Sequence, residues 1–451
     1  KSGALVAAIF YLYAPYHSVD LYVRGALAEF YSFVFLPAVF FSTLKLFKEK
    51  NLKWTIINSL FLSFFLLSHN LMVLPFLPFY LVFLIFLFWK EREKKKVFLL
   101  LGFSGLLFLG LTVYFWLPAL LERKYTLVDE ILTHELASYK LHFVYLRQFL
   151  NSAWGYGGSI PGPEDGLSFE VGKLHLLFAF LGGILGFCLF LKKKTEGKIL
   201  LFSVSCFLFS LFMASFRSQF IWDHLQPLWY LQFPWRFLLF SAFFSSILAG
   251  GLISFFANRV QKSTPKYLII FLSILAVILL NKDYFTPLKY LDVADKNYTN
   301  NDELHWRVSK MSWEFVPKGV ATTLSDIKTT QMAITKAELP KELFKAGPGI
   351  DIIVEKDLVQ YKKLKVEGKG GILTLNVYNF PGWEVEVDKQ KVLINDYNKF
   401  KLISFGVPAG KHEVIVQFKD TPVRKIGNFL TAISFLVLAA SLAIKLYGKK
   451  K

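Results

Sequence analysis

Nine apolar stretches, each long enough to cross a lipid bilayer as a helix, dominate this chain of 451 residues. They cover residues 26–47, 54–69, 71–89, 97–117, 174–191, 199–216, 236–256, 267–281 and 426–446, and a partial stretch at 2–13 precedes them. Charged residues make up only 19% of the chain, against roughly a quarter in soluble domains. The sequence therefore predicts a polytopic α-helical membrane protein with about nine full spans plus one partial span. It excludes a soluble enzyme, a coiled coil and a disulfide scaffold.

Most of the net charge of +19 lies in five short segments between or after these stretches. The segments are residues 45–53, 90–96, 192–198, 257–266 and 445–451. They contain 20 Lys and Arg but only 4 acidic residues, so they carry +16 of the total. Threading the chain through the spans puts all five on one face, as the positive-inside rule requires of the cytosolic side. We therefore expect a multi-pass protein of the cell membrane with a cytosolic C-terminus, and no nucleic-acid binding.

The remaining polar sequence falls on the opposite, outer face. The chain divides into a membrane core (1–281, with outer loops 118–173 and 217–235), a mixed segment (282–350), a strand-rich segment (351–425) and the last span with its basic tail (426–451). Apolar and polar residues alternate along the strand-rich segment, which predicts antiparallel strands with one buried face. We expect an extracytoplasmic β-sandwich before the last span, with Leu375, Val385, Val387 and Val414 inside.

Residues that bind metals or cofactors are few and dispersed. Cys188 and Cys206 both lie inside apolar stretches, and no two of the eight histidines are spaced for a metal site. The run Gly155–Gly158 follows no strand and precedes no P-loop lysine, which excludes a nucleotide-binding loop. We therefore expect no cofactor, and nothing in the sequence indicates a divalent metal.

Several motifs on the predicted outer face point to a family. They are Tyr11–Glu29 with Pro37 in the following helix, Ser68-His-Asn-Leu71, Gln232-Phe-Pro-Trp-Arg236, and the pair Trp154–Gly158 and Gly162–Gly166. Together they resemble bacterial multi-pass proteins with the membrane domain related to 6-pyruvoyl-tetrahydropterin synthase. The resemblance implies the GT-C architecture of membrane glycosyltransferases, which transfer a sugar from a polyprenyl-phosphate carrier to an envelope acceptor on the outer face. The scattered histidines argue against the zinc chemistry of the soluble pterin synthase.

The catalytic acid is where this chain departs from that family. The resemblance implies an acidic residue in the first outer loop, upstream of the Tyr-Ala-Pro-Tyr motif at 13–16. Almost nothing precedes that motif, so we expect an N-terminal segment to be missing and assign no catalytic residue. The alternative function is a non-catalytic membrane scaffold whose sandwich binds envelope glycans or partner proteins. A transporter is disfavoured because charged residues inside the spans are scarce.

Two arginines at predicted outer span ends are the candidate ligands of the donor phosphate. Arg24 and Arg236 run against the positive-inside bias, and a planar guanidinium suits phosphate oxygens. We expect them to converge on one cavity, with Glu29 steering Arg24. The alternatives are a structural ion pair between Arg24 and Glu29, and an Arg236 that only snorkels to the interface.

Other residues on the same face are candidates for supporting or sugar-contacting roles. His69 and Asn70 form a predicted outer turn, in which His69 would offer a neutral hydrogen-bond donor or both residues would serve only the turn. Trp154, Tyr156 and Trp235 are candidate sugar-facing aromatics, although a glycine-rich outer loop is often simply irregular.

Overall fold

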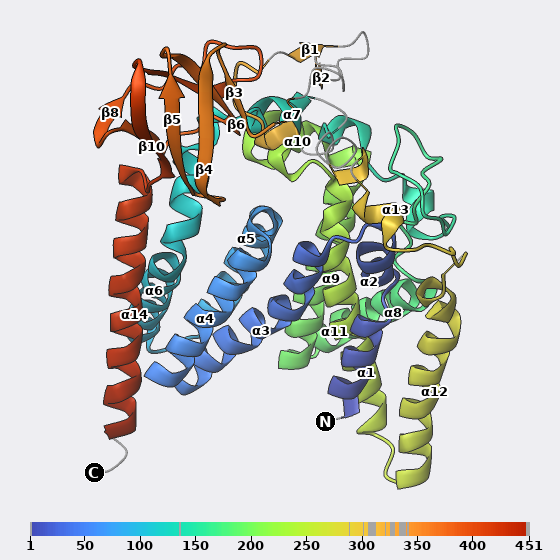
Figure 1. Ribbon diagram of the computed structural model, residues 1–451. Coiled ribbons are helices and arrows are strands. Elements are labelled where there is room, and N and C mark those ends of the chain that lie inside the picture. The colour runs from blue at the N-terminus through green and yellow to red at the C-terminus, as the bar shows by residue number, and fades with distance from the viewer. Residues whose placement is uncertain are drawn as a thin grey trace. The chain divides into compact units, whose positions relative to one another are not determined.

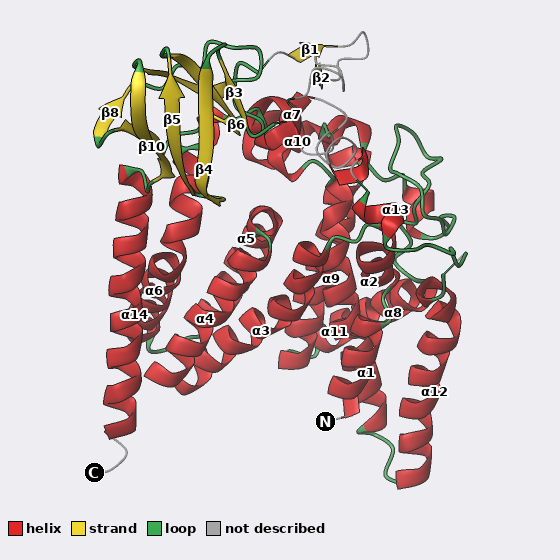
Figure 2. Cartoon of the chain, in the orientation of Figure 1, coloured by secondary structure: helices red, strands yellow, loops and turns green. Residues whose placement is uncertain are grey.

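The computed structural model describes residues 2–134, 137–287, 289–300, 302–304, 313–320, 322–324, 330–332, 340 and 342–447. It is mostly helical, with a separate β-sheet region near the C-terminus (Figures 1 and 2). The chain forms two compact units. The first comprises Lys1–Leu109, Ala137–Asp292 and Val437–Lys451, and the second comprises Gly110–Leu136 and Val293–Leu436. The basic tail Lys449–Lys451 lies outside the described residues.

Helices make up the first unit. They are α1 (Ser2–Leu12), α2 (Pro15–Ser18), α3 (Leu27–Glu49), α4 (Leu52–Ser68), α5 (Val73–Phe88), the first part of α6 (Lys94–Leu121), α8 (Lys173–Leu191), α9 (Thr195–Ala214), α10 (Gln219–His224), α11 (Leu238–Ala257) and α12 (Ser263–Asn281). Short turns join them: η1 (Val19–Val23), η2 (Asn70–Met72), η4 (Tyr139–Leu141), η5 (Leu146–Phe149), η6 (Phe216–Ser218), η7 (Gln226–Leu231), η8 (Pro234–Phe237) and η9 (Lys282–Phe285).

Eight helical segments among the described residues are long and apolar enough to cross a membrane. They are Leu27–Glu49, Asn70–Phe88, Lys94–Tyr125, Lys173–Leu191, Thr195–Ala214, Pro234–Ala257, Ser263–Phe285 and Pro422–Ile444. The ninth predicted stretch, 54–69, corresponds to the 17-residue helix α4, and the partial stretch corresponds to the 11-residue helix α1. Every predicted stretch is therefore helical, and α4 is shorter than any of the eight segments.

Helix α11 is the central helix of the first unit. It is the most buried of the candidate spans and packs against α1, α8 and α9. Small residues permit this close packing: a Cβ on Gly250 would lie 2.4 Å from the backbone oxygen of Gly3 in α1. Such small-residue contacts replace the hydrophobic driving force that helices lack inside a bilayer.

A buried polar network joins α3, α4 and α6. Asn58 donates to Thr43 Oγ1 at 2.8 Å and to Ser42 Oγ at 3.0 Å, and its own oxygen accepts from Ser104 at 2.9 Å. Thr43 also lies 3.0 Å from the hydroxyl of Tyr80 in α5. Interhelical hydrogen bonds of this kind hold membrane helices together.

The second unit contains three β-sheets, the end of α6 and most of α14. Its elements are η3 (Arg123–Tyr125), α7 (Val128–His134), α13 (Lys296–Thr299), η12 (Trp313–Phe315), β1 (Thr322–Leu324), β2 (Thr330–Met332), β3 (Phe344–Ala346), β4 (Ile350–Leu358), β5 (Tyr361–Gly368), β6 (Gly371–Tyr378), β7 (Trp383–Val387), β8 (Gln390–Val392), β9 (Leu402–Val407), β10 (Gly410–Phe418) and α14 (Pro422–Tyr447).

The two larger sheets form the predicted β-sandwich. One sheet has the strand order β4-β5-β10-β7-β8 and the other β3-β6-β9, and all their pairings are antiparallel. A single apolar core lies between them, with residues from both sheets. The predicted interior residues are 5% exposed or less, as the alternation requires: Leu375, Val385, Val387 and Val414. The sandwich prediction is therefore confirmed.

An ion pair ties α6 to α14 at the base of the second unit. Arg424 donates to Glu122 Oε2 from Nε at 2.9 Å and from Nη2 at 2.7 Å, and Thr421 donates to the other oxygen. Glu122 is 7% exposed, so this bidentate pair is largely desolvated. It ties the start of the last helix to the end of α6.

Candidate functional site: a buried arginine–carboxylate cluster

The cluster begins with the unusual backbone that follows α1. Pro15 opens α2, which passes directly into the π-helical turn Val19–Val23. The amide of Arg24 then bonds to the Val19 carbonyl, and Gly25 ends the turn with φ of 62°, a left-handed conformation that suits glycine. This geometry puts Asp20 and Arg24 side by side, and the two side chains form an ion pair.

Glu29, in the first turn of α3, is the centre of the cluster. Its side chain is fully buried and accepts hydrogen bonds on both oxygens. Oε1 accepts from the Tyr16 hydroxyl at 2.8 Å, whereas Oε2 accepts from Arg24 Nη1 at 2.7 Å and from Arg236 Nε at 3.0 Å. The two predicted arginines therefore converge on one carboxylate oxygen.

Arg236 reaches Glu29 from a distant part of the sequence. It lies in the turn η8, which precedes α11, and is 6% exposed. Its Nη1 donates to the Leu231 carbonyl at 2.7 Å, while its Nε points to Glu29. The guanidinium is held from two sides, so it is part of the buried network and is not a surface anchor.

Aromatic rings line the cluster. The Arg24 guanidinium lies 4.4 Å from the ring centroid of Trp235, and that of Arg236 lies 5.1 Å from the ring of Phe233. Trp235 and Phe233 stack with centroids 4.7 Å apart. Trp235 is only 2% exposed and also contacts Tyr16. Cation–π contacts with desolvated arginines of this type stabilise the charged network.

Burial controls the ionisation of the groups around the cluster. Burial and the nearby charge of Glu29 raise the pKa of Asp20 above its ordinary value. Burial, with the charge of Arg236, lowers the pKa of His69 to about 4, so this imidazole is neutral at pH 7. Burial likewise lowers the pKa of His17 to about 3. The described network thus combines two arginines, Glu29 and an aspartate that binds a proton more readily than usual.

Several polar atoms at the cluster have no hydrogen-bond partner within the described part of the chain. They are Asp20 Oδ2, His17 Nδ1, His69 Nδ1 and Trp235 Nε1, and each is buried. Buried polar atoms in native proteins are nearly always paired. Asp20 is the most informative of them, because one carboxylate oxygen binds Arg24 while the other has no donor.

The remaining predicted site residues lie in different surroundings. Asn70 is exposed, and its side chain accepts from the amide of Leu71 at 3.0 Å, which is turn chemistry. Trp154 and Tyr156 form a group of their own, with ring centroids 5.8 Å apart. Trp154 also packs edge-on against Tyr284 at 5.3 Å, and Tyr156 is 44% exposed.

Sequence reasoning missed Asp20 and Tyr16 as members of the cluster. Both lie inside the motif Tyr11–Glu29, and Asp20 precedes Arg24 by four residues, a spacing that places side chains on one helical face. That spacing could have identified the pair. Among the residues that the structure describes, no group of three or more His, Cys, Asp or Glu is arranged to hold a metal ion.

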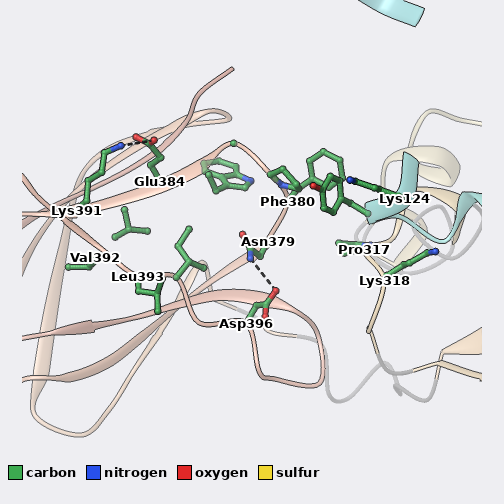
Figure 3. Close-up of a pocket in the computed structure, with 16 residues that line it drawn as sticks. Lys124, Pro317, Lys318, Asn379, Phe380, Glu384, Lys391, Val392, Leu393 and Asp396 are labelled. Carbon is green, nitrogen blue, oxygen red and sulfur yellow. Dashed lines mark hydrogen bonds and ion pairs between the residues drawn. The ribbon is translucent and has the colours of Figure 1, made fainter. Parts of the chain in front are cut away.

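A second candidate site is a pocket of 530 Å³ in the second unit (Figure 3). Two backbone hydrogen bonds build one wall, from Lys318 to Tyr125 at 3.0 Å and from Leu127 to Val316 at 2.9 Å. The sandwich supplies the other wall, from the turn before β7 and from the chain around β8. The first wall therefore joins two segments that are nearly 200 residues apart in the sequence.

Aromatic and paired polar side chains line this pocket together. Tyr125, Phe380 and Trp383 contribute rings, and Tyr125 packs edge-on against Phe380 at 6.1 Å. Asn379 donates to Asp396 at 3.1 Å, and Lys391 donates to Glu384 at 2.8 Å (Figure 3). Trp383 also packs against Phe418 at 5.2 Å and is half-buried at the pocket.

Comparison with known proteins adds no relative. No family model matches the chain, and no match was found among curated proteins or among solved structures.

The arginine–carboxylate cluster is suited to binding and proton transfer. The described hydrogen bonds of Arg24 to Asp20 and Glu29 all leave from Nη1, so its Nε and Nη2 can serve another acceptor. Arginine remains protonated even where it is desolvated, and its fork matches phosphate oxygens. Burial raises the pKa of Asp20, so its ionised carboxylate is a stronger proton acceptor than an ordinary aspartate.

Proposed function

We propose that this protein is a GT-C-like membrane glycosyltransferase that transfers a sugar from a polyprenyl-phosphate donor to an envelope acceptor on the outer face. The observation that carries the proposal is the convergence of Arg24 and Arg236 on the buried Glu29. Charged groups buried at the end of a membrane helix bundle are costly and commonly mark a substrate site. The motif resemblance supports the same reaction class.

In this proposal the two arginines hold the donor phosphate. Arg24 offers Nε and Nη2, while Glu29 and the Trp235 ring fix the plane of its guanidinium. Arg236 adds a second positive charge from the start of α11. The arginines then stabilise the negative charge that develops on the departing phosphate oxygen.

Asp20 is the proposed general base. Its unpaired Oδ2 takes the proton of the acceptor hydroxyl as that oxygen forms a bond to the anomeric carbon. The bond between the sugar and the phosphate breaks in the same step, and the electron pair stays with the polyprenyl phosphate. The raised pKa of Asp20 favours proton uptake near neutral pH.

The proposal also requires a particular membrane topology. We count α4 as a span, because 17 residues is the lower limit for crossing a bilayer, and the basic segments then all face the cytosol. The cluster lies at the start of α3 and of α11, which this topology places at the outer surface. The C-terminus is cytosolic in the same arrangement.

Binding of a polyprenyl phosphate to the purified full chain tests the phosphate site. Arg24→Gln and Arg236→Gln should each weaken binding by roughly tenfold to a hundredfold, because a charged hydrogen bond contributes about 1.5–3 kcal/mol. The matched control is Arg147→Gln, since Arg147 forms an exposed ion pair with Glu164. Equal affinity in folded variants and control would contradict the proposal. Asp20→Asn should bind the donor and lose transfer.

A second candidate function is a scaffold that binds envelope glycans through its sandwich. The observation in its favour is the pocket with three aromatic rings and two polar pairs, a combination that suits sugar faces and hydroxyls. Two variants separate the candidates. If Asp20→Asn keeps the cellular function and Trp383→Ala loses it, the scaffold is favoured, and the reverse pattern favours the transferase.

A further inference from the structure

A large apolar cavity lies in the first unit, among α3, α5, α9 and α11. Its volume is 880 Å³, within the range of about 300–1,000 Å³ that is typical of ligand pockets. Phenylalanines form much of its lining, among them Phe40, Phe83, Phe202 and Phe244. The lining is therefore suited to a hydrocarbon chain.

Two lysines give this cavity a polar end. Lys90 follows the end of α5, and Lys198 lies in the first turn of α9. Neither has an acidic partner within 4 Å among the residues that the structure describes. The neighbouring Glu91 pairs with Lys50 at 2.9 Å, so that carboxylate already has a cation.

The cavity lies away from the arginine cluster along the bundle. Helix α5 begins close to His69, whose imidazole interacts electrostatically with Arg236 and Glu29 of the cluster. From there it runs 16 residues towards Lys90. That length corresponds to about 24 Å of helix rise. The lysines therefore mark the opposite end of the first unit, where the basic segments of the sequence lie.

We propose that this cavity binds an anionic phospholipid, with an acyl chain between the phenylalanines and the headgroup phosphate at Lys90 and Lys198. Charge decides the occupant: two lysines without acidic partners favour an anionic headgroup over a zwitterionic one. Basic pockets between membrane helices at the cytoplasmic side bind anionic lipid headgroups for this reason. The inference goes beyond the proposed transferase function and does not depend on it.

The polyprenyl-phosphate donor is an alternative occupant of this cavity, and binding experiments can distinguish it from a phospholipid. A polyprenyl phosphate held at the arginine cluster would place its only charged group at the other end of the first unit, so it would gain nothing from Lys90 and Lys198. A zwitterionic lipid would fill the same apolar lining but would lose little when the lysines are removed.

Native mass spectrometry of the full chain in detergent tests the site, with phosphatidylglycerol, phosphatidylcholine and polyprenyl phosphate as probes. Phosphatidylglycerol should bind most tightly, and Lys90→Gln/Lys198→Gln should weaken its binding about 25-fold, at roughly fivefold for each lysine. The control is Lys192→Gln/Lys193→Gln, because both residues are exposed in the same basic region and do not line the cavity.

A steric variant tests the acyl-chain position separately. Ser205 is exposed and lines the cavity, so Ser205→Trp should fill the space without disturbing the helix core. It should abolish the tight phosphatidylglycerol adduct and leave donor binding at the arginines intact. The proposal is overturned if the lysine variant matches its control, if phosphatidylcholine binds as tightly, or if polyprenyl phosphate is the lipid that the lysines select.

Discussion

Replacing Glu29 by glutamine should destabilise the protein strongly, because this side chain joins both arginines and Tyr16. Glutamine keeps one acceptor oxygen but loses the charge and places an amide donor among donors. Removing one partner of a buried ion pair costs about 3–5 kcal/mol, since the other charge stays buried. Asp20 still pairs with Arg24, so we expect the lower end, about 3 kcal/mol. In a chain of this length that corresponds to a decrease in melting temperature of about 3 °C.

Thermal unfolding of the detergent-solubilised chain, scanned at one rate, measures this effect. Glu49→Gln is the matched control, because Glu49 ends the same helix and also accepts hydrogen bonds from Lys45 and Trp54. Its site is exposed, so its loss should leave the melting temperature nearly unchanged. If Glu29→Gln has the same melting temperature as the control, the buried network does not stabilise the fold, and the positions of the two arginines need another explanation.

Three further predictions concern topology and the sandwich. In a cysteine-free background, an impermeant thiol reagent should label Leu393→Cys in intact cells and leave Lys194→Cys unlabelled; the opposite pattern would refute the orientation. Val385→Asp should lower the free energy of unfolding of the sandwich by several kcal/mol, because it buries an unpaired carboxylate. The change should appear as rapid proteolysis of the sandwich. Unchanged resistance to the protease would contradict the inward position of Val385. Asp388 raises the pKa of His412 above 6.5. This pair should therefore stabilise the sandwich below pH 6.5, and the stabilisation should be lost as the pH rises through the raised pKa of His412. His412→Gln should remove this dependence of the melting temperature on pH.

Local patterns in the sequence were sufficient for the main architecture. Apolar stretches predict helices because a bilayer-spanning backbone must satisfy its own hydrogen bonds, and period-two alternation predicts which side chains enter a sandwich core. Arg24 and Arg236 could be identified as neighbours for a physical reason as well. Both break the charge bias of the loops, and a cation on the wrong side of a membrane needs a partner.

Features that depend on distant contacts could not be read in the same way. The network of Asn58 joins three helices, and no spacing in the sequence indicates which side chains face each other. The pocket in the second unit combines Tyr125 with Phe380 through backbone pairing with Lys318, a contact that has no sequence pattern. Asp20 differs from these residues, because its four-residue spacing to Arg24 is visible in the sequence.

The arrangement of the cluster argues against a purely structural role. A buried ion pair is seldom more stable than well-packed apolar residues of the same volume, so stability alone does not account for two arginines and two acids at this depth. Asp20 Oδ2, His69 Nδ1 and Trp235 Nε1 are three of the seven buried polar atoms without a partner in the described chain, and they surround one network. A network selected only to hold helices together would satisfy such atoms, as the Asn58 network does. Charged groups held rigidly beside unpaired polar atoms are instead the arrangement that a site needs when its hydrogen bonds are completed by a substrate.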